Sequence, residues 1–395
     1  MRDVPDPALK PDQVAVKVLR VGLCGTDMEI NEGLYGQAPE GLDYLILGHE
    51  NFGVVEEVGK KAKGFQPGNF VVATVRRPCG RCYNCAHGED DLCTSGAYTE
   101  RGIKGRHGFM AEYYVESPQY LNKIPRAAKE IGVLLEPMSV VEKGIDHAFR
   151  IQKRMLWKPR LAVVLGAGPV GLLAAAVLRN RGLRTVVVGR EPQSDPRAQI
   201  VPQMQAEYFS VEKGSLNGLP KHFGPLDLVV EATGSSTVAF AAMQSLAPNG
   251  ILCLLSVTGG DKTVLEPTDQ INQDLVLRNN VVFGSVNANP RHFRMGVRDL
   301  AASKRSTRTS SRSSLPSDCR GPSTRSGSQS AARGSRRRSK SAASVMSQKS
   351  LAIVCCLQGQ RGLCQEHMDA GYKPALLAEA RLIWRTYVRP KALTP

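Results

Sequence analysis

The sequence predicts an α/β protein in which a doubly wound parallel sheet follows a smaller, mostly β domain. Two observations support this: an apolar run ending in regularly spaced glycines at 161–172, and short strand-like segments separated by turns before residue 120. The 395 residues suffice for two or three domains, and 42% hydrophobic residues suffice for their cores. We divide the chain into 1–150, 151–286, a return segment 287–300 and a basic tail 301–395.

Short strands separated by glycine turns fill the first part of the chain. Residues 14–21 form a strand-like run, and 54–58 and 70–75 are two further apolar runs. Glycines at 53, 59, 64 and 68 mark the turns around them. Strands of this length and spacing are typical of a sandwich or barrel, so a mostly β domain is predicted here.

The glycine-containing stretch predicts a dinucleotide-binding unit. Leu161–Leu165 is apolar throughout, as expected for a strand buried on both faces of a parallel sheet. The motif G-x-G-x-x-G that follows consists of Gly166, Ala167, Gly168, Pro169, Val170 and Gly171. Such a motif makes a tight turn and lets a pyrophosphate approach the start of a helix. A helix over 172–180, ended by Gly182, and a strand over 185–188 complete the βαβ unit.

The residue after the second strand indicates the cofactor. An acidic residue at this position usually binds the ribose 2′-hydroxyl of NAD, whereas an arginine suits the 2′-phosphate of NADP. Here it is Arg190, with Glu191 and Arg197 close behind. The sequence therefore favours NADP, with NAD as an alternative. The competing interpretation of Arg190 is a solvated loop cation.

Further apolar runs continue the alternation of strands and helices. Residues 226–234, ending in a tight turn, 250–255 and 280–287 predict later strands of the same sheet, and Cys253 within one of them is most simply a core residue. Ligands bind at the carboxyl ends of the strands in such sheets, so the segments after these strands are expected to line the site.

Four cysteines stand at the spacing of metal ligands. They are Cys79, Cys82, Cys85 and Cys93. Four thiolates on one loop can close a tetrahedral site without a free position, so a structural zinc is predicted. Buried thiols or chance cysteines would not predict this spacing. Ten cysteines in a chain of this length do not indicate a secreted disulfide scaffold, and neither an apolar leader nor a run of 18 apolar residues is present, so we expect a cytoplasmic protein.

A second set of metal ligands is sparser: Cys24, His49 with Glu50, and Glu136. A catalytic zinc needs three such ligands and an open position for a substrate oxygen. Each residue also has an ordinary interpretation, as a core cysteine, a satisfied histidine or a solvated carboxylate. Their spacing alone does not bring them together.

Motifs in a fixed order give a resemblance to a known family. Cys24-Gly25-Thr26-Asp27, Gly48-His49-Glu50, the four-cysteine loop and the glycine motif resemble the zinc-containing medium-chain dehydrogenase/reductases. Within them, residues 102–114 and 135–143 resemble the glucose 1-dehydrogenases first known from archaea. The resemblance ends at about residue 300.

The resemblance implies a GroES-like catalytic domain joined to a Rossmann domain, with substrate and nicotinamide between them. It implies that Cys24, His49 and Glu136 bind the catalytic zinc, with Glu50 as a ligand or a neighbouring carboxylate. It assigns Thr26 to the relay of the substrate proton. It assigns sugar contacts to Glu136, Glu112 and Asn287, and further cofactor contacts to Thr233, Leu254, Leu255, Ser256, Ser285, Val286 and Asn287.

Some of these assignments have alternatives. The competing interpretation of Glu112 is a solvated strand residue, and that of Asn287 is a turn residue. Val140 stands where some relatives have a polar sugar contact, which leaves the exact sugar open.

The implied activity is hydride transfer from C1 of an aldose, such as D-glucose, to NADP, giving an aldonolactone, with zinc as Lewis acid. Buried carboxylate and amide groups suit a polyol, whereas the pocket of a simple alcohol would be apolar. The alternatives are another zinc-dependent alcohol, polyol or threonine dehydrogenase, and an inactive nucleotide-binding relative. A dimer or tetramer is implied where the C-terminus is intact.

Composition changes sharply after Leu300. Lys and Arg outnumber Asp and Glu by 18 to 4 in 301–395, against 34 to 32 before it, and 17 serines fall in 301–350. We expect no ordered structure there. One interpretation is a basic appendage for nucleic acid or an anionic surface, although 301–350 has no aromatic residue for base stacking.

We favour a change of reading frame near residue 300, because the family would continue there with helices and strands. The chain also has fewer residues before Cys24 than the family's first hairpin needs. We therefore expect this chain to fold poorly and to have little activity. The nucleotide sequence decides this, since the original frame should encode a dehydrogenase ending.

Overall fold

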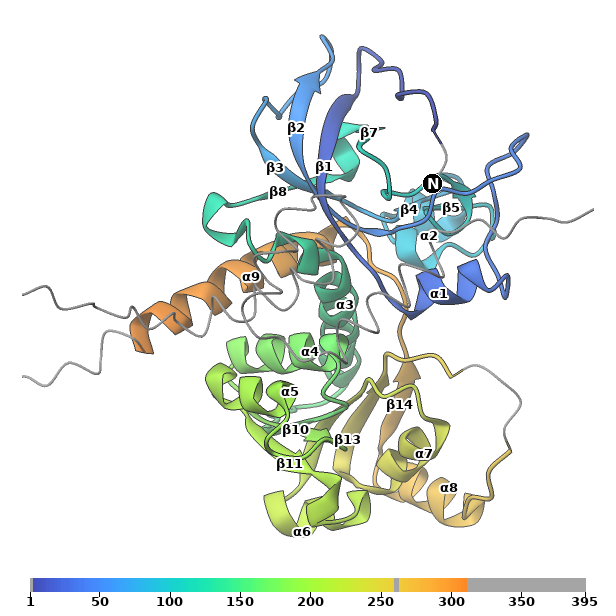
Figure 1. Ribbon diagram of the computed structural model, residues 1–395. Helices are drawn as coiled ribbons and strands as arrows, with labels where there is room; N and C mark the ends of the chain where they lie inside the picture. The colour runs from blue at the N-terminus through green and yellow to red at the C-terminus, as the bar shows by residue number, and fades with distance from the viewer. Residues whose placement is uncertain (1–2, 259–262, 311–395) are drawn as a thin grey trace, which may run out of the picture. The chain divides into compact units, whose positions relative to one another are not determined.

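The computed structural model describes residues 3–258 and 263–310, of which 5–304 belong to one compact unit (Figure 1). Residues 301–310 of the predicted tail are helical, because a helix that begins at Pro290 continues through them, so the expectation of no ordered structure is wrong there; the rest of the tail lies outside the described residues. Among the described helices, none combines the length and the apolar character that crossing a bilayer requires.

Five strands form an antiparallel sheet in the order β7-β1-β2-β3-β8. They are β1 (Val14–Gly22), β2 (Glu50–Val58), β3 (Phe70–Ala73), β7 (Tyr113–Glu116) and β8 (Leu121–Ile124). Val14, Val16, Val55, Val71 and Phe109 form its buried core. The predicted mostly β domain is thereby confirmed, with β2 starting four residues earlier than the apolar run. Pairing of β1 with β2 sets Gly22 opposite Glu50.

A smaller lobe carries the four cysteines. It contains the three-stranded sheet β4 (Arg76–Arg77), β5 (Thr99–Arg101) and β6 (Gly105–Arg106), the short helix α2 (Tyr83–Ala86) and the 3-10 turn η1 (Asp90–Leu92). These elements are short, so they bury little apolar surface of their own.

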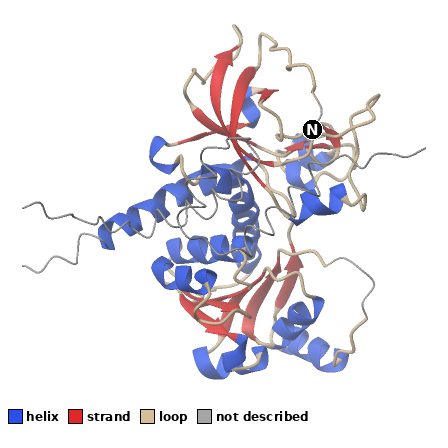
Figure 2. Ribbon diagram, viewed as in Figure 1, coloured by secondary structure: helices blue, strands red, loops and turns tan. Residues whose placement is uncertain are grey.

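Six parallel strands form the second sheet, in the order β11-β10-β9-β12-β13-β14. Figure 2 shows this sheet as red arrows with blue helices around it. They are β9 (Leu161–Leu165), β10 (Arg184–Gly189), β11 (Glu207–Ser210), β12 (Leu226–Glu231), β13 (Leu246–Leu254) and β14 (Val281–Gly284). Numbered along the chain this order is 3-2-1-4-5-6, that of a Rossmann fold. All five residues of β9 are buried, as its apolar run predicts. The predicted fold class is confirmed.

The remaining helices are α1 (Gly25–Asn31), α3 (Leu135–Gln152), α4 (Pro169–Asn180), α5 (Pro196–Ile200), α6 (Leu219–Phe223), α7 (Ser236–Gln244), α8 (Thr268–Leu277) and α9 (Pro290–Ser310). Helix α4 starts at Pro169, three residues before the predicted start, because proline suits the first helical position. It ends where predicted: Gly182, just beyond it, has φ +82°.

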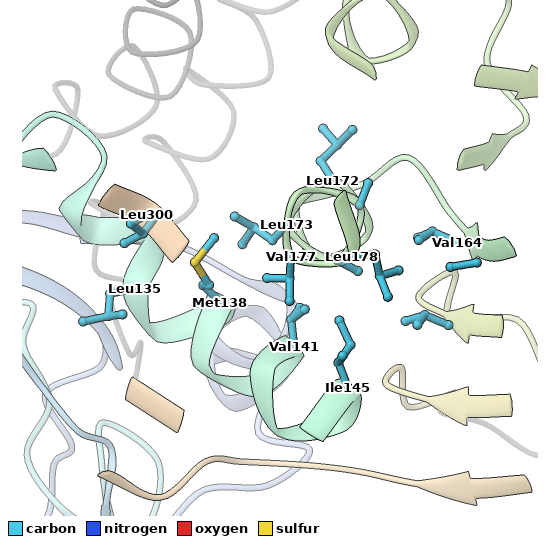
Figure 3. Close-up of a cluster of buried hydrophobic side chains, with 14 of the residues drawn as sticks. Leu135, Met138, Val141, Ile145, Val164, Leu172, Leu173, Val177, Leu178 and Leu300 are labelled. Atoms are coloured by element: carbon cyan, nitrogen blue, oxygen red, sulfur yellow. The ribbon is translucent and has the colours of Figure 1, made fainter. Parts of the chain in front are cut away.

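Helix α3 joins the two halves of the compact unit. Its side chains Met138, Val141 and Ile145 point toward Leu173 and Val177 of α4 (Figure 3). The burial of each such side chain stabilises the fold by about 1.5–3 kcal/mol. The first turn of α3 is therefore held against α4, the helix that packs on the parallel sheet.

Candidate metal and cofactor site

Cys24 lies directly before α1, where the chain leaves β1. Its backbone N–H donates to Asp27 Oδ2 over 3.1 Å, and Asp27 Oδ1 accepts the Gly48 N–H over 3.2 Å. Asp27 is buried, so one carboxylate caps the helix start and fixes the residue that precedes His49.

His49 faces the thiol of Cys24, with 3.1 Å between Nε2 and Sγ. The other ring nitrogen, Nδ1, lies 3.4 Å from Asp27 Oδ1 and has no well-formed hydrogen bond among the described residues. Burial lowers the pKa of His49, but Asp27, Cys24 and Glu136 together raise it well above the usual value. A histidine with a thiol before it and a carboxylate behind it is the usual arrangement of a zinc ligand.

Two more carboxylates approach the same histidine. The ligand atoms of His49, Glu50 and Glu136 lie within 4.8 Å of one another, as do those of Cys24, Asp27 and His49. Burial and the charge of Glu136 raise the pKa of Glu50 to about 8, and burial raises that of Glu136 to about 7. Ionised carboxylates this close and this buried need a cation between them. The donor set therefore fits Zn²⁺, which accepts thiolate, imidazole and carboxylate ligands.

The local backbone favours the carboxylates of Glu50 and Glu136 for two different reasons. A β-carbon on Gly22 would lie 2.0 Å from Glu50 Oε2, so a larger residue at this position of β1 would displace the carboxylate. Glu136 lies in the first turn of α3, where free N–H groups and the helix dipole favour a negative charge.

The four cysteines converge, as their spacing predicts. All four sulfur atoms lie within 4.8 Å of one another, with 3.8 Å between Cys79 and Cys85 and between Cys82 and Cys93. Backbone N–H groups lower the pKa of Cys82 to about 5, while burial raises that of Cys85 to about 12. Four convergent thiols fit a closed tetrahedral zinc site, in which the ion would keep Cys85 deprotonated.

Asn287 meets Glu100 beside the metal donors. Asn287 Nδ2 donates to Glu100 Oε1 over 2.7 Å, and the charge of Glu100 contributes to the raised pKa of Glu136. Glu112, in contrast, is exposed before β7, and its backbone carbonyl accepts the Val18 N–H. Its carboxylate belongs to neither donor set.

Thr26 lies in the first turn of α1, next to the thiol of Cys24. Its side chain interacts with that of Tyr35: partial burial raises the pKa of Tyr35, and Thr26 offsets part of this rise. The charges of Cys24 and His49 also act on Tyr35, so this hydroxyl pair lies near the metal donors.

The glycine motif forms the turn between β9 and α4. A β-carbon on Gly171 would lie 1.9 Å from the Gly166 carbonyl oxygen, so only glycine permits this close approach. One on Gly168 would meet nothing within 4 Å, which leaves its backbone open to a phosphate.

A buried carboxylate links the strand ends that face this turn. Glu231, 1% exposed, accepts the Thr233 N–H and hydroxyl, each over 2.6 Å, and the Ser256 hydroxyl. Leu254 accepts the Ser285 N–H over 3.0 Å, and Leu255 follows it at the end of β13. The predicted cofactor residues at the ends of β12, β13 and β14 are thus neighbours.

Arg190 stands at the end of β10 with a side chain that is 90% exposed. Glu191 pairs with Arg197 at 3.0 Å and with Arg190 only at 3.6 Å. The charge of Glu191 is therefore balanced chiefly by Arg197, and Arg190 stays accessible to an anion.

Sequence reasoning missed four residues of the site: Asp27, Tyr35, Glu100 and Glu231. Asp27 could have been found, because an acid three residues after Cys24 follows the capping-box spacing. Glu231 ends an apolar strand, a position where an acidic side chain is unusual. Tyr35 and Glu100 carry no such local signal.

Comparisons with known proteins agree with this geometry. Residues 10–126 match the alcohol dehydrogenase GroES-like domain, and residues 129–310 match the glucose dehydrogenase C-terminus. The chain is 48% identical over 304 residues to glucose 1-dehydrogenase of Methanocella arvoryzae, which covers 77% of this chain and 85% of that protein. It is 45% identical over 307 residues to glucose 1-dehydrogenase 1 of Caldivirga maquilingensis, covering 77% and 84%.

A solved structure is also similar: Haloferax mediterranei glucose dehydrogenase in complex with NADP, Zn and gluconolactone. Its TM-score is 0.70 at 35% identity, over 76% of this chain and 85% of that chain. Likeness of this extent, in sequence and in fold, makes the chain a member of the glucose 1-dehydrogenase family of zinc-containing medium-chain dehydrogenases, and so a glucose 1-dehydrogenase-like NAD(P) oxidoreductase.

Proposed function

We propose that the protein oxidises C1 of an aldose such as D-glucose to the aldonolactone, with NADP as the hydride acceptor. The observation that carries this proposal is the 2.7 Å hydrogen bond between Asn287 and Glu100 beside Glu136. It gathers carboxylate and amide groups next to metal donors, which suits a ligand with several hydroxyl groups.

Cys24, His49 and Glu136 would hold the catalytic zinc, with Glu50 as a fourth ligand or a neighbouring carboxylate. When bound, zinc supplies a Lewis acid and NADP accepts a hydride. Asp27 orients the His49 ring from behind. Cys79, Cys82, Cys85 and Cys93 would hold the second, structural zinc.

The Thr26 hydroxyl takes the proton released by the sugar hydroxyl. Tyr35 is the next hydroxyl along, because its side chain interacts with that of Thr26 and is 44% exposed. A proton leaving the site has a path of two hydroxyl groups toward solvent.

Glu100 and Asn287 bind sugar hydroxyl groups. Asn287 has one amide N–H in the bond to Glu100, and both side chains have further hydrogen-bonding capacity. The prediction for Glu112 stands beside this one, but its exposed carboxylate makes Glu100 the better candidate.

NADP would lie on the glycine turn, with its pyrophosphate at Gly168 and the start of α4. The exposed guanidinium of Arg190 would bind the 2′-phosphate. The Ser285 hydroxyl, buried and without a hydrogen-bond partner among the described residues, fits a polar group of the cofactor.

The test is a substrate panel on the full chain supplied with zinc. D-glucose, D-galactose, D-xylose, a polyol, a simple alcohol and L-threonine are compared by the formation of NADPH and NADH. We expect an aldose with NADP to give the highest kcat/KM. Preference for a polyol, an alcohol or threonine would replace the proposed substrate.

Paired variants test the sugar contacts. Glu100→Gln should raise the KM for the sugar by about tenfold, because one charge-assisted hydrogen bond is weakened. Glu57→Gln, on the exposed side of β2, is the matched control. Glu112→Gln decides between the two carboxylates, since only the residue that touches the sugar should alter KM.

A further inference from the structure

Five chain segments close a ring of hydrogen bonds and one ion pair that includes the proposed sugar-binding residues. Lys143 Nζ lies 2.7 Å from Asp91 Oδ2 and donates to the Val286 carbonyl oxygen over 2.8 Å. The next residue, Asn287, donates to Glu100, which accepts from Arg76 Nε and Nη2 over 3.1 and 3.0 Å. Arg76 Nη1 donates to the Asp91 carbonyl oxygen over 2.9 Å and closes the ring.

The ring has two features of a device that fixes geometry. Its centre is buried, because Lys143 and Asp91 are 2% and 4% exposed. Its bonds also fix Asn287 from two sides, because Lys143 donates to the carbonyl oxygen of the preceding residue, Val286, and Glu100 accepts from the Asn287 side chain.

The ring connects the cysteine lobe with the segment that carries Asn287. Asp91 lies in η1, two residues before Cys93, and its Oδ1 accepts from Asn289 Nδ2 over 3.0 Å. Arg291 adds two bonds to Glu89, over 2.9 and 3.1 Å. The segment 286–291 is therefore bonded to the lobe along its length.

The remaining partner is the helix of the metal ligand Glu136. Lys143 follows Glu136 by seven residues, which is two turns, so both lie on one face of α3. The buried ammonium group of Lys143 thus links α3, the helix that carries Glu136, to the cysteine lobe and to the Val286 carbonyl oxygen.

We propose that Lys143 is a positioning residue for the sugar site: through Asp91 and Val286 it holds Asn287 against Glu100 beside the metal donors. This inference rests on the proposed function, because it gives Asn287 and Glu100 their role in binding the sugar. It also gives the cysteine lobe a second role, as the support from which Asn287 is held.

The experiment separates positioning from stability with three variants of the full chain. Lys143→Met removes the ammonium group and leaves Asp91 buried without its partner, so both the melting temperature and sugar binding should suffer. Lys143→Met with Asp91→Asn removes both charges, which should recover part of the melting temperature. Arg181→Met is the control, because the partly exposed Arg181 contacts the buried Glu142, which is next to Lys143 on α3.

Two measurements are made on each variant besides the melting temperature. The first is the KM for D-glucose at saturating NADP, which should rise about tenfold or more in both Lys143 variants and stay within about twofold in Arg181→Met. The second is amide hydrogen exchange of peptides that cover 285–291, which should quicken in both Lys143 variants only.

The outcomes are distinguishable. Recovery of the glucose KM together with the melting temperature in the double variant would overturn the proposal, because the role of Lys143 would then be stability alone. Unchanged exchange over 285–291 in Lys143→Met would overturn it as well. If the parent chain oxidises no sugar, the proposed function fails, and the exchange measurement still decides whether Lys143 holds this segment.

Discussion

His49 Nδ1 lies 3.4 Å from Oδ1 of Asp27, a buried carboxylate that is also bonded to the backbone of Cys24 and Gly48. Asp27 is thus placed to orient the imidazole. Carboxylates behind a zinc-bound histidine set its tautomer and increase its basicity.

Asp27→Asn should therefore weaken zinc binding at the catalytic site by about tenfold to a hundredfold, with all proposed ligands still present. The measurement is competition for zinc with a chromophoric chelator, followed by the metal content of the protein. Glu29→Gln, an exposed position on the same helix, serves as the control. Equal zinc affinity in Asp27→Asn and the parent would show that the carboxylate serves only as a helix cap.

Cys85→Ser should remove the structural zinc, because a tetrahedral thiolate site does not close with three sulfur atoms. We expect about one zinc fewer per chain and a lower melting temperature, since metal binding is coupled to folding. Cys253→Ala is the matched control, because this thiol is buried in β13 and far along the chain from the lobe. A zinc content as high in Cys85→Ser as in Cys253→Ala would contradict the assignment.

Arg190→Ala should raise the KM for NADP about tenfold and leave that for NAD nearly unchanged, because only NADP carries the 2′-phosphate. Arg184→Ala is the control: this arginine begins the same strand and is paired with Glu207 at 2.7 Å. Steady-state kinetics with both cofactors give the comparison. Equal losses with NADP and NAD would assign Arg190 to the loop instead of to the phosphate.

Glu142 makes stability depend on pH. Burial and the hydrogen bond with Asp299 raise its pKa to about 8, and Arg181 only partly offsets this. Between its ordinary value of 4.5 and about 8 the folded chain keeps a proton that the unfolded chain releases. Stability should therefore fall as pH rises through this window, by at most about 1.4 kcal/mol per pH unit.

Glu142→Gln should flatten that part of the curve, since the neutral amide has no proton to lose. Denaturant unfolding between about pH 5 and pH 8 measures it. Glu207→Gln, in the exposed pair with Arg184, is the control. A slope unchanged by Glu142→Gln would place the titration elsewhere.

The fold and the four-cysteine set were predictable because their signals are local. The run Leu161–Leu165, the glycine spacing and the four cysteines each act through residues close in the chain, and the structure has them as expected. The hydrogen bond between Asn287 and Glu100 was not predictable, because 187 residues separate the two in the sequence. Glu112 was assigned from the family resemblance, and no local pattern reports which carboxylate faces a distant amide.

Helix α3 is held in place at both of its ends. Its first turn presents Glu136 to the metal donors, and its last residue, Gln152, donates to the Asn249 carbonyl oxygen over 2.6 Å within β13. A shift of strand β13 would therefore move the C-terminal end of α3 and change the orientation of Glu136. Substitutions in the core of the parallel sheet are thus expected to weaken metal binding, although they touch none of the proposed ligands.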